Sequence, residues 1–438
     1  MIAWLTARER WQPALAGFAW WAIFHPGFIS EDSISQLLDI RSGSYSVWFT
    51  AWWVYVVNAL TLGARVIPLM TLVSVVTLEY AVYFWIRTVF PRTPARAVTV
   101  ALIAFSPLVG AMGIQIRHDV ALATGLLIAA AVVTRTWSAP TLTVREYSLL
   151  LLAMPLVATR HNGVPTLIAA AVLMVILSRK WWRHAAVLVV VAGGASVITY
   201  AATRASSNAT AVDPLQTVEW LMADISCALA RGVEPTGDEW ATLAKIAARD
   251  AWPQPRACVV MNPMLVGGAV NPTAAVTNYR DLIGVWRSLA MRHPGQMIAA
   301  HASRVRLFLP PRPPLEVPSF LHSTVVPNDF GIRWTFPSLA ERVRVVVRGW
   351  NAGGFILANS MVWLIALLIA AWRMPSWRDR LTPTIVIGSA LNLGLIVAAP
   401  VSEGRYGLFI LVSGQATVLY ALLSRVITEL EPRALAPE

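Results

Sequence analysis

Charged residues are scarce in this chain, and lysine is almost absent. Only 13% of its 438 residues are charged, whereas soluble domains carry about 25%. Lysine occurs only at Lys180 and Lys245, so arginine supplies almost all of the positive charge, and the net charge is +12. Hydrophobic residues make up 57% of the chain, and the mean hydropathy is +0.59. This composition argues against a soluble protein and predicts a polytopic membrane protein.

Several motifs with a known chemistry are missing as well. The chain contains no Walker motif, no dinucleotide-binding glycine motif, no metalloprotease helix motif and no serine nucleophile elbow. Its basic residues form short clusters between apolar segments, not a stripe with a readable DNA or RNA motif. We therefore predict no nucleic-acid partner, because membrane topology accounts for the positive charge.

Ten apolar segments can cross a hydrocarbon core of about 30 Å, if the short ones are buried among neighbours. They cover residues 11–28, 66–88, 97–116, 119–134, 148–159, 163–177, 185–202, 353–372, 381–400 and 407–424. The first segment follows Arg8 and Arg10 and lacks a small-residue cleavage site, so we expect a retained span. Glu79 is the one markedly misplaced charge inside a span.

The segment Val47–Leu62 is apolar but rich in tryptophan and tyrosine, as in an interfacial belt. If it does not cross, the basic connections join the N-terminal arm on the cytoplasmic side; they are residues 91–96, 135–147, 178–184 and 373–380. If it crosses, their charges lie outside, against the positive-inside rule. We therefore predict that it dips, that residues 29–65 form an external loop with two surface helices, and that both termini are cytoplasmic.

Polar residues at four span ends all fall on the predicted external side. They are Glu31-Asp32, Arg117-His118-Asp119, Arg160-His161-Asn162 and Glu403-Gly404-Arg405-Tyr406. These short loops mix acids with arginines and histidines, whereas the cytoplasmic loops are almost purely basic. The alternative is that span ends are simply polar. We predict that the four loops converge on one external site.

A polar region, residues 203–352, separates an N-terminal transmembrane module, residues 1–202, from C-terminal transmembrane helices, residues 353–438. By parity this region is external, and its patterns predict helices over Leu215–Arg231, Asp238–Asp250, Asn278–Arg292 and Ser338–Arg348. Both cysteines, Cys227 and Cys258, lie here. An external location permits a disulfide, and two free buried thiols remain the alternative.

Residues of the first external loop resemble a known superfamily. Pro26-Gly27 is followed by Asp32-Ser33 and Gln36, and further matches are Asp119, Arg160-His161-Asn162-Gly163 and Arg405-Tyr406. In these positions the chain resembles the GT-C superfamily of polyprenyl-phosphate-dependent glycosyltransferases. Relatives include protein O-mannosyltransferases, aminoarabinose transferases and the catalytic subunit of oligosaccharyltransferases. The chain looks most like a poorly characterised bacterial branch.

The resemblance implies an all-α bundle of about ten transmembrane helices with external juxtamembrane helices and a mostly helical external region. It also implies that Asp32 is a general base or an acceptor-orienting carboxylate, and that Asp119 is a second acid or a metal ligand. The chain departs from the pattern in two places. Ser46-Val47-Trp48 stands where a His-Pro-Pro type motif is common, and His118 stands where the branch commonly has lysine. Acceptor identity and metal use are therefore open.

The residue types themselves suit transfer from a lipid phosphate. A carboxylate within hydrogen-bond reach can take a proton from an acceptor hydroxyl, and we rank Asp32 first, Glu31 second and Asp39 third. Arginine gives a leaving phosphate two parallel charge-assisted hydrogen bonds, and we rank Arg405, Arg160 and Arg117. The alternative is an arginine that snorkels at a membrane edge. Further predicted substrate-binding residues are Gln36, His118, His161, Asn162, Glu403 and Tyr406.

A divalent cation, Mg²⁺ or Mn²⁺, could bind between Asp32 and Asp119, because hard cations prefer carboxylate oxygens. Two acids are few for such a site. The sequence therefore predicts no dedicated metal ligands, and a reaction that depends on a metal weakly or not at all.

We predict a membrane glycosyltransferase on the external face of the bacterial cytoplasmic membrane. Its donor would be a polyprenyl-phosphate-linked sugar, and its acceptor a glycan, lipid or protein of the cell envelope. A transporter or flippase of a lipid-linked sugar is the alternative, and an assembly subunit without chemistry is a third. A flippase needs polar residues along a path across the membrane, whereas the polar residues here collect at one surface.

Overall fold

The structure, a computed structural model, describes residues 6–43, 50–138, 141–206, 214–258, 269–309, 321, 323–398 and 404–434. Helices make up most of these ranges. The extended pairing within them is limited to three isolated bridges, Phe28 with Gln115, Ile29 with Val325, and Ala247 with Val270. The prediction of an all-α membrane protein is therefore confirmed.

The chain divides into two compact units. Unit 1 comprises Met1–Ala209, Pro313–Asn392 and Gly404–Glu438, and unit 2 comprises Thr210–Arg312 and Leu393–Glu403. The predicted region 203–352 thus contributes to both units, because residues 313–352 group with the apolar helices of unit 1. The polarity of the sequence does not predict the boundary between the two units, because polarity indicates exposure to water and not which segments pack together.

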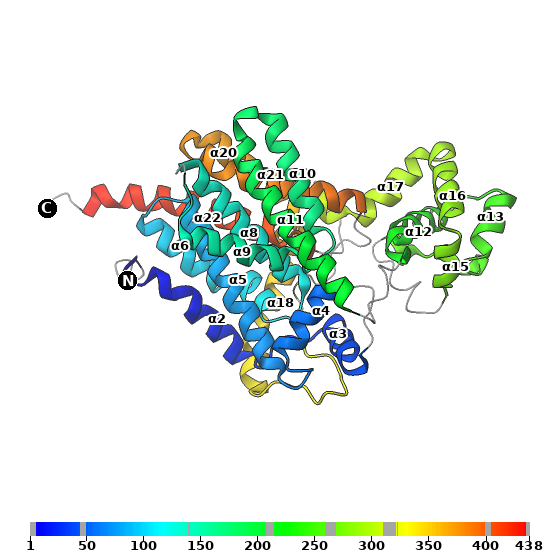
Figure 1. The fold of residues 1–438 in the computed structure, drawn as a ribbon, viewed down its shortest axis with the longest axis horizontal. Helices are drawn as coiled ribbons and strands as arrows, with labels where there is room; N and C mark the ends of the chain where they lie inside the picture. The colour runs from blue at the N-terminus through cyan, green and yellow to red at the C-terminus, as the bar shows by residue number, and fades with distance from the viewer. Residues whose placement is uncertain are drawn as a thin grey trace. The chain divides into compact units, whose positions relative to one another are not determined.

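Unit 1 is a bundle of apolar helices (Figure 1). Its longer helices are α2 (Gln12–Ile23), α5 (Ile67–Val89), α6 (Pro94–Ala104), α8 (His118–Ser138), α9 (Val144–Val157), α10 (Gly163–Leu177), α11 (Trp182–Ala205), α18 (Pro337–Ala352), α20 (Ser360–Arg373), the first part of α21 (Pro375–Ala398) and α22 (Leu408–Ala434). The shorter ones are α7 (Pro107–Gly113) and α19 (Gly354–Leu357). Helix α5 packs against α2, α7 and α8, while α22 packs against α6 and α20.

Five helices in the described ranges are long and apolar enough to cross a membrane: Ile67–Val89, His118–Trp137, Arg179–Ala205, Pro375–Val397 and Arg405–Glu429. The pair α6 and α7, bent by 47°, would make a sixth span. Four other predicted spans fall on α2, α9, α10 and α20, which have 12 to 15 residues. At 1.5 Å per residue these helices are shorter than a hydrocarbon core, so the count of ten spans stays a prediction.

Two short helices follow α2 in the predicted external loop. Helix α3 (Glu31–Ser42) begins at a capping box, in which the Ser30 hydroxyl accepts from the Ser33 amide, and ends at Gly43 with a φ of 66°. Helix α4 (Ala51–Leu60) begins where the Thr50 hydroxyl accepts from the Trp53 amide. Its 10 residues span only about 15 Å, and the path of this segment at the membrane stays a prediction. Residues 44–49, including Ser46-Val47-Trp48, lie outside the described residues.

Unit 2 consists of short helices around a separate apolar core that includes Met222, Leu243, Trp252 and Leu289. Its helices are α12 (Pro214–Ala230), α13 (Gly237–Ala244), α15 (Pro272–Thr277), α16 (Tyr279–Arg292) and α17 (Pro294–Arg304), with the end of α21. Helix α13 ends six residues before the predicted Asp250. The Leu243 carbonyl accepts from the Ala247 amide and also from the Trp252 indole, and the Ile246 carbonyl accepts from the Asn271 amide, so the chain beyond Ala244 bonds to distant residues.

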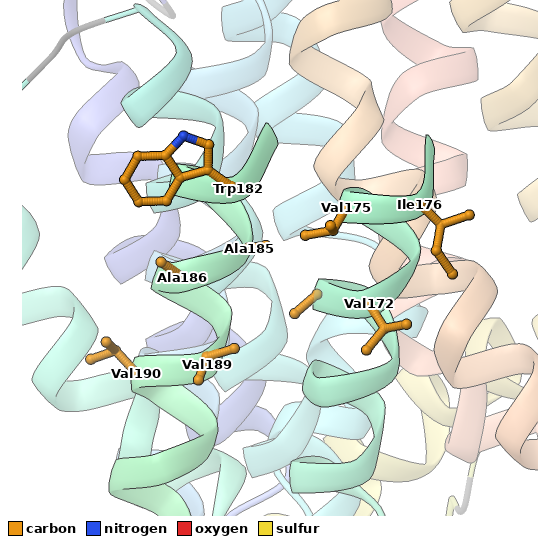
Figure 2. Close-up of a pocket in the computed structure, with 9 residues that line it drawn as sticks. Val172, Val175, Ile176, Trp182, Ala185, Ala186, Val189 and Val190 are labelled. Carbon is orange, nitrogen blue, oxygen red and sulfur yellow. The ribbon is translucent and has the colours of Figure 1, made fainter. Parts of the chain in front are cut away.

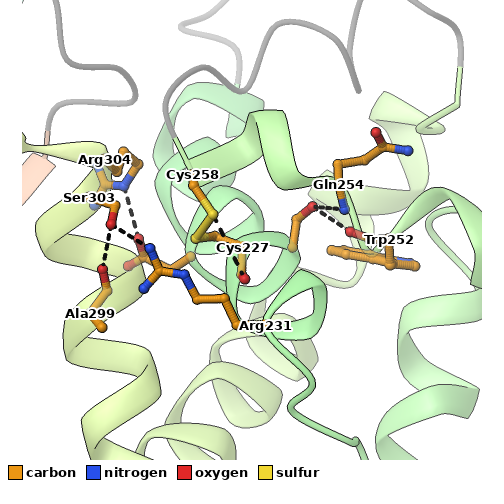
Figure 3. The surroundings of a disulfide bond; sticks show 10 residues. Cys227, Arg231, Trp252, Gln254, Cys258, Ala299, Ser303 and Arg304 are labelled. Carbon is orange, nitrogen blue, oxygen red and sulfur yellow. Dashed lines mark hydrogen bonds and ion pairs between the residues drawn. A yellow bond between two sulfur atoms is a disulfide. The ribbon is translucent and has the colours of Figure 1, made fainter. Parts of the chain in front are cut away.

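A disulfide joins Cys227 of α12 to Cys258 (Figure 3). Of the two alternatives open from the sequence, the structure contains the disulfide. A buried ion-pair cluster lies on the same helix, where Asp224, fully buried, accepts from Arg304 Nε at 2.9 Å and contacts His301 Nδ1 at 3.0 Å. These contacts tie α12 to α17 and hold unit 2 together.

Candidate functional site

A turn at Pro26-Gly27 precedes helix α3, which carries Asp32. Gly27 has a φ of 129°, which favours glycine, and a Cβ here would collide with the Ile114 carbonyl oxygen. The Phe28 amide donates to that same oxygen at 3.2 Å, and Phe28 pairs with Gln115 in a parallel bridge. Asp32 and Arg117 each come shortly after one of these two paired segments in the chain. The pairing therefore brings the two residues, 85 positions apart, into contact.

The start of α3 is fixed by buried polar contacts. The Ser33 hydroxyl donates to the Ile116 carbonyl at 3.3 Å. The Gln36 side chain donates to the Asp32 carbonyl at 2.9 Å and accepts from the Trp53 indole at 2.6 Å. Because Ser33, Gln36 and Trp53 are buried, these bonds set the position of the first turn of α3 and of the Asp32 carboxylate on it.

Asp32 lies between two arginines from distant parts of the chain. Its Oδ2 accepts from Arg117 Nη1 at 3.2 Å and from Arg405 Nη1 at 2.6 Å. Arg405 belongs to the short helix η6 (Gly404–Gly407), which leads into α22. Two charge-assisted hydrogen bonds on one oxygen fix the position of the Asp32 carboxylate between the two arginines.

Asp119 forms the second half of the cluster, on the first turn of α8. Its carboxylate pairs with Arg160, lies 3.7 Å from Arg405 Nε and lies 3.8 Å from His118 Nε2. Arg160 also lies over the Tyr406 ring, with its Cζ 4.3 Å from the ring centroid. Arg405 thus contacts both carboxylates, and the two ion-pair groups form one site.

Charge and exposure distinguish the two acids. Three guanidinium groups face two carboxylates, so the cluster carries a net charge of about one positive unit. The Asp32 side chain is 44% exposed, whereas that of Asp119 is 2% exposed. The Asp32 carboxylate is therefore accessible from solvent, whereas the Asp119 carboxylate is enclosed beside Arg160 and Arg405.

The other predicted residues differ in where they lie. His118 is close to the cluster, with its ring 6.3 Å from that of Trp53. Asn162 precedes α10 without capping it through its side chain. Partial desolvation and the adjacent Arg160 charge lower the pKa of His161, so this exposed imidazole is neutral at pH 7. Glu31 is exposed and joins no ion pair with another described residue. Glu403 lies outside the described residues.

Sequence patterns did not reveal one segment that supports the site. Residues 324–335, which fall between the predicted helices of the polar region, run beside the Pro26-Gly27 turn. The Ile29 amide donates to the Thr324 carbonyl, the Val326 amide donates to the Ile29 carbonyl, and the Trp334 indole donates to the Gly27 carbonyl. Such pairing between distant extended residues leaves no local periodicity, so no signal in the sequence points to it.

The donor set does not fit a divalent cation. Within the described ranges, no three acidic, histidine or cysteine side chains are grouped as metal ligands. Asp32 and Asp119 are each engaged by guanidinium groups, which oppose a cation by their charge.

The fold and site together define an all-α membrane protein with a partly exposed arginine–carboxylate cluster. No protein-family model matches the chain, and no curated protein matches it. One solved structure that it resembles is the apo form of an oligosaccharyltransferase from Archaeoglobus fulgidus, at 13% identity and a TM-score of 0.41. The likeness covers 100% of this chain and 52% of that one, so the chain spans about half the length of that protein. A likeness of this strength carries no argument about activity.

Proposed function

We propose that the chain is a membrane glycosyltransferase that moves a sugar from a polyprenyl-phosphate donor to a cell-envelope acceptor. The observation that carries this proposal is the Asp32 carboxylate held between Arg117 and Arg405, beside the pair of Asp119 and Arg160. The site places a reachable acid and several guanidinium groups at one end of an apolar bundle. Transfer from an anionic lipid head needs both.

The arginines suit the phosphate of the donor. A guanidinium group is planar, stays charged and binds phosphate through two parallel hydrogen bonds. Arg117 is buried, and its Nε has no acceptor among the described residues. The excess positive charge of the cluster attracts an anion, and the resemblance to polyprenyl-phosphate-dependent enzymes agrees with a phosphate.

Asp32 supplies the proton acceptor in this proposal. The acceptor hydroxyl attacks C1 of the sugar, the bond from C1 to the phosphate oxygen breaks, and the hydroxyl proton passes to the Asp32 carboxylate. Polyprenyl phosphate leaves with the bonding electrons, and its added negative charge is stabilised by Arg405 and Arg160. When a donor phosphate engages Arg405, it relieves the pairing that holds Asp32, so donor binding prepares the base.

The membrane setting follows from the predicted topology. With both termini cytoplasmic, the cluster lies on the external face of a bacterial cytoplasmic membrane, where the donor head is reached from the lipid phase. The acceptor is a glycan, a lipid or a protein of the envelope. The sugar and the prenyl length are not specified by any residue of the cluster.

Substitution of Asp32 by asparagine tests the proposal. We expect Asp32→Asn to lower sugar transfer by a factor of 100 or more, as removal of a general base does, while the purified chain stays monodisperse. The measurement is transfer of label from a panel of polyprenyl-phosphate sugars to envelope extract. The matched control is Asp379→Asn, an exposed carboxylate of unit 1 outside the cluster, and transfer that persists in Asp32→Asn would refute the assignment.

The same assay separates the enzyme from the flippase alternative. In detergent there are no membrane sides, so a flippase forms no product, whereas a glycosyltransferase makes a new glycosidic bond. Chelation extends the test, because we propose that turnover in EDTA stays within about twofold of the untreated rate. Complete loss with EDTA and recovery with Mg²⁺ or Mn²⁺ would instead assign a metal to Asp32 and Asp119.

A further inference from the structure

A groove separates α10 from α11 at the end of these helices away from the Asp32 cluster. Its volume is about 570 Å³, and its lining is made of Ala171, Val172, Val175, Ile176, Trp182, Ala185, Ala186, Val189 and Val190 (Figure 2). Ala171 and Ala185 are buried at the floor, whereas Ala186, the valines, Ile176 and Trp182 are exposed. The groove is therefore apolar, and its walls are exposed on the outer face of the bundle.

Three cations flank the lining residue Trp182 in the chain, at the turn between α10 and α11. Arg179 and Lys180 lie in the short helix η2 (Arg179–Trp181), and Arg183 lies in the first turn of α11. All three side chains are exposed, and none forms an ion pair with a described residue. The partial positive charge at the start of the 24-residue helix α11 adds to theirs. An anion beside Trp182 would therefore meet several uncompensated positive charges.

The turn that carries these cations is held in place. The Trp137 ring stacks on the His184 ring at a centroid distance of 4.1 Å, and it meets the Trp181 ring edge-on at 5.2 Å. His184 Nδ1 also lies 2.6 Å from the Thr136 hydroxyl. These contacts fix the turn against the end of α8, so the charges and the groove keep one geometry.

We propose that this groove binds an anionic phospholipid, with one acyl chain along α10 and α11 and its phosphate at Arg179, Lys180 and Arg183. Burial of the acyl chain alone gives little selectivity between lipids, because lipid tails surround the whole bundle. Selectivity comes from the headgroup, because basic residues between transmembrane helices attract anionic lipids. A zwitterionic lipid of equal chain length fits the groove but gains less from the three cations.

The occupant is a structural lipid and not the proposed sugar donor. The donor phosphate belongs at Arg160 and Arg405, and Val175 lies 12 residues beyond Gly163, at the far end of α10 from Arg160. Twelve helical residues rise about 18 Å. This inference does not depend on the proposed function, because it concerns a second anion site at the opposite end of the helix.

Lipid binding to the purified full chain tests the proposal. After delipidation, the probes are phosphatidylglycerol and phosphatidylcholine with identical acyl chains, measured by native mass spectrometry and by the shift in melting temperature. We expect tighter binding of phosphatidylglycerol, by about fivefold per basic residue. Equal affinity for the two lipids would overturn the proposal.

Two kinds of variant separate the headgroup from the groove. The triple variant Arg179→Gln, Lys180→Gln, Arg183→Gln should lose the preference for phosphatidylglycerol, and Ala186→Trp should weaken binding of both lipids by filling the groove. The matched control is the triple variant Arg92→Gln, Arg373→Gln, Arg378→Gln, which removes equal charge from exposed positions elsewhere. If the control loses the preference equally, or if Ala186→Trp binds normally, the lipids form only a non-specific shell and the site is refuted.

Discussion

Arg405 is the residue that joins the two acids of the cluster. Its Nη1 bonds to Asp32 at 2.6 Å, and its Nε lies 3.7 Å from Asp119. Hydrogen bonds to charged groups contribute about 1.5–3 kcal/mol. We therefore expect Arg405→Gln to weaken binding of a short-chain polyprenyl phosphate by at least about tenfold, with a smaller loss for Arg405→Lys, which keeps the charge but not the planar fork. Titration of purified variants by native mass spectrometry measures this.

A surface arginine provides the comparison for that experiment. Arg378 is exposed at the start of α21 and lies outside the cluster. Arg378→Gln removes the same formal charge, so it should leave the affinity within about twofold. Equal losses in the two variants would mean that net charge, and not the Arg405 contact, governs binding.

The sequence indicated these residues through topology. Asp32, Arg117, Asp119, Arg160 and Arg405 each lie at a span end, and parity placed those ends on one side, so their proximity was a reasonable prediction. The structure brings these five together. It leaves Glu31 outside the cluster, because the first turn of α3 points that side chain to solvent. Counting spans does not predict which side chains pair, for example Arg405 with Asp119, because pairing depends on the direction in which each side chain points.

At the scale of elements, the Pro26-Gly27 turn sets where α3 begins. Gly27 combines a φ of 129° with a close approach to Ile114. We expect Gly27→Ala to displace the Phe28 and Gln115 pairing and to cost about 1–3 kcal/mol, with sugar transfer reduced more than tenfold. Gly193→Ala is the control, since a Cβ there meets nothing within 4 Å. Equal transfer by the two variants would contradict this role of the turn.

Helix α13 gives a prediction of pH dependence. Burial opposes ionisation of Glu239, but hydrogen bonds from Ser288, Thr236 and Arg292 outweigh it and lower the pKa of Glu239 below 4.5. Because the folded pKa is the lower one, this stabilisation is present above pH 4.5 and is lost as pH falls through the folded pKa. Glu239→Gln should lose about 1 kcal/mol at pH 7 and show a weaker pH dependence.

Hydrogen exchange of peptides from α13 measures this local stability. The wild type should lose protection when the pH falls below 4.5, and Glu239→Gln should show a smaller change. Asp238→Asn, a neighbour whose side chain is exposed, serves as the control. A parallel loss of protection in the wild type and in Glu239→Gln would show that the capping box does not control the pH response.

Periodicity predicted helices better than it predicted their ends or their grouping. The pattern over Asn278–Arg292 matches α16 within one residue, because its apolar face is local in sequence. The end of α13 depends on the distant Trp252 and Asn271, and the place of residues 324–335 depends on Ile29 and Gly27. These contacts join segments far apart in sequence, so the local periodicity of hydrophobic residues does not predict them.

At the scale of the whole molecule, the Asp32 cluster and the disulfide belong to different units. The described ion pairs of the Asp32 cluster lie in unit 1, while the Cys227–Cys258 disulfide lies in unit 2. We therefore expect the two units to unfold separately, so that a substitution that destabilises one unit leaves the other folded. Two measurements on one sample test this: affinity for polyprenyl phosphate reports on unit 1, and hydrogen exchange reports on the stability of each unit.

Removal of the disulfide tests the separation. The bond closes a loop over a sequence separation of 31, so its loss should destabilise unit 2 by about 3–4 kcal/mol through the entropy of the unfolded chain. The double variant Cys227→Ser, Cys258→Ser should therefore lose exchange protection in α12 and α16, whereas α5 and α8 keep theirs. Its affinity for polyprenyl phosphate should stay within about twofold of the wild type, because the phosphate would bind arginines of unit 1. Loss of protection in both units at once, or an affinity change as large as that of Arg405→Gln, would show that unit 2 supports the cluster directly.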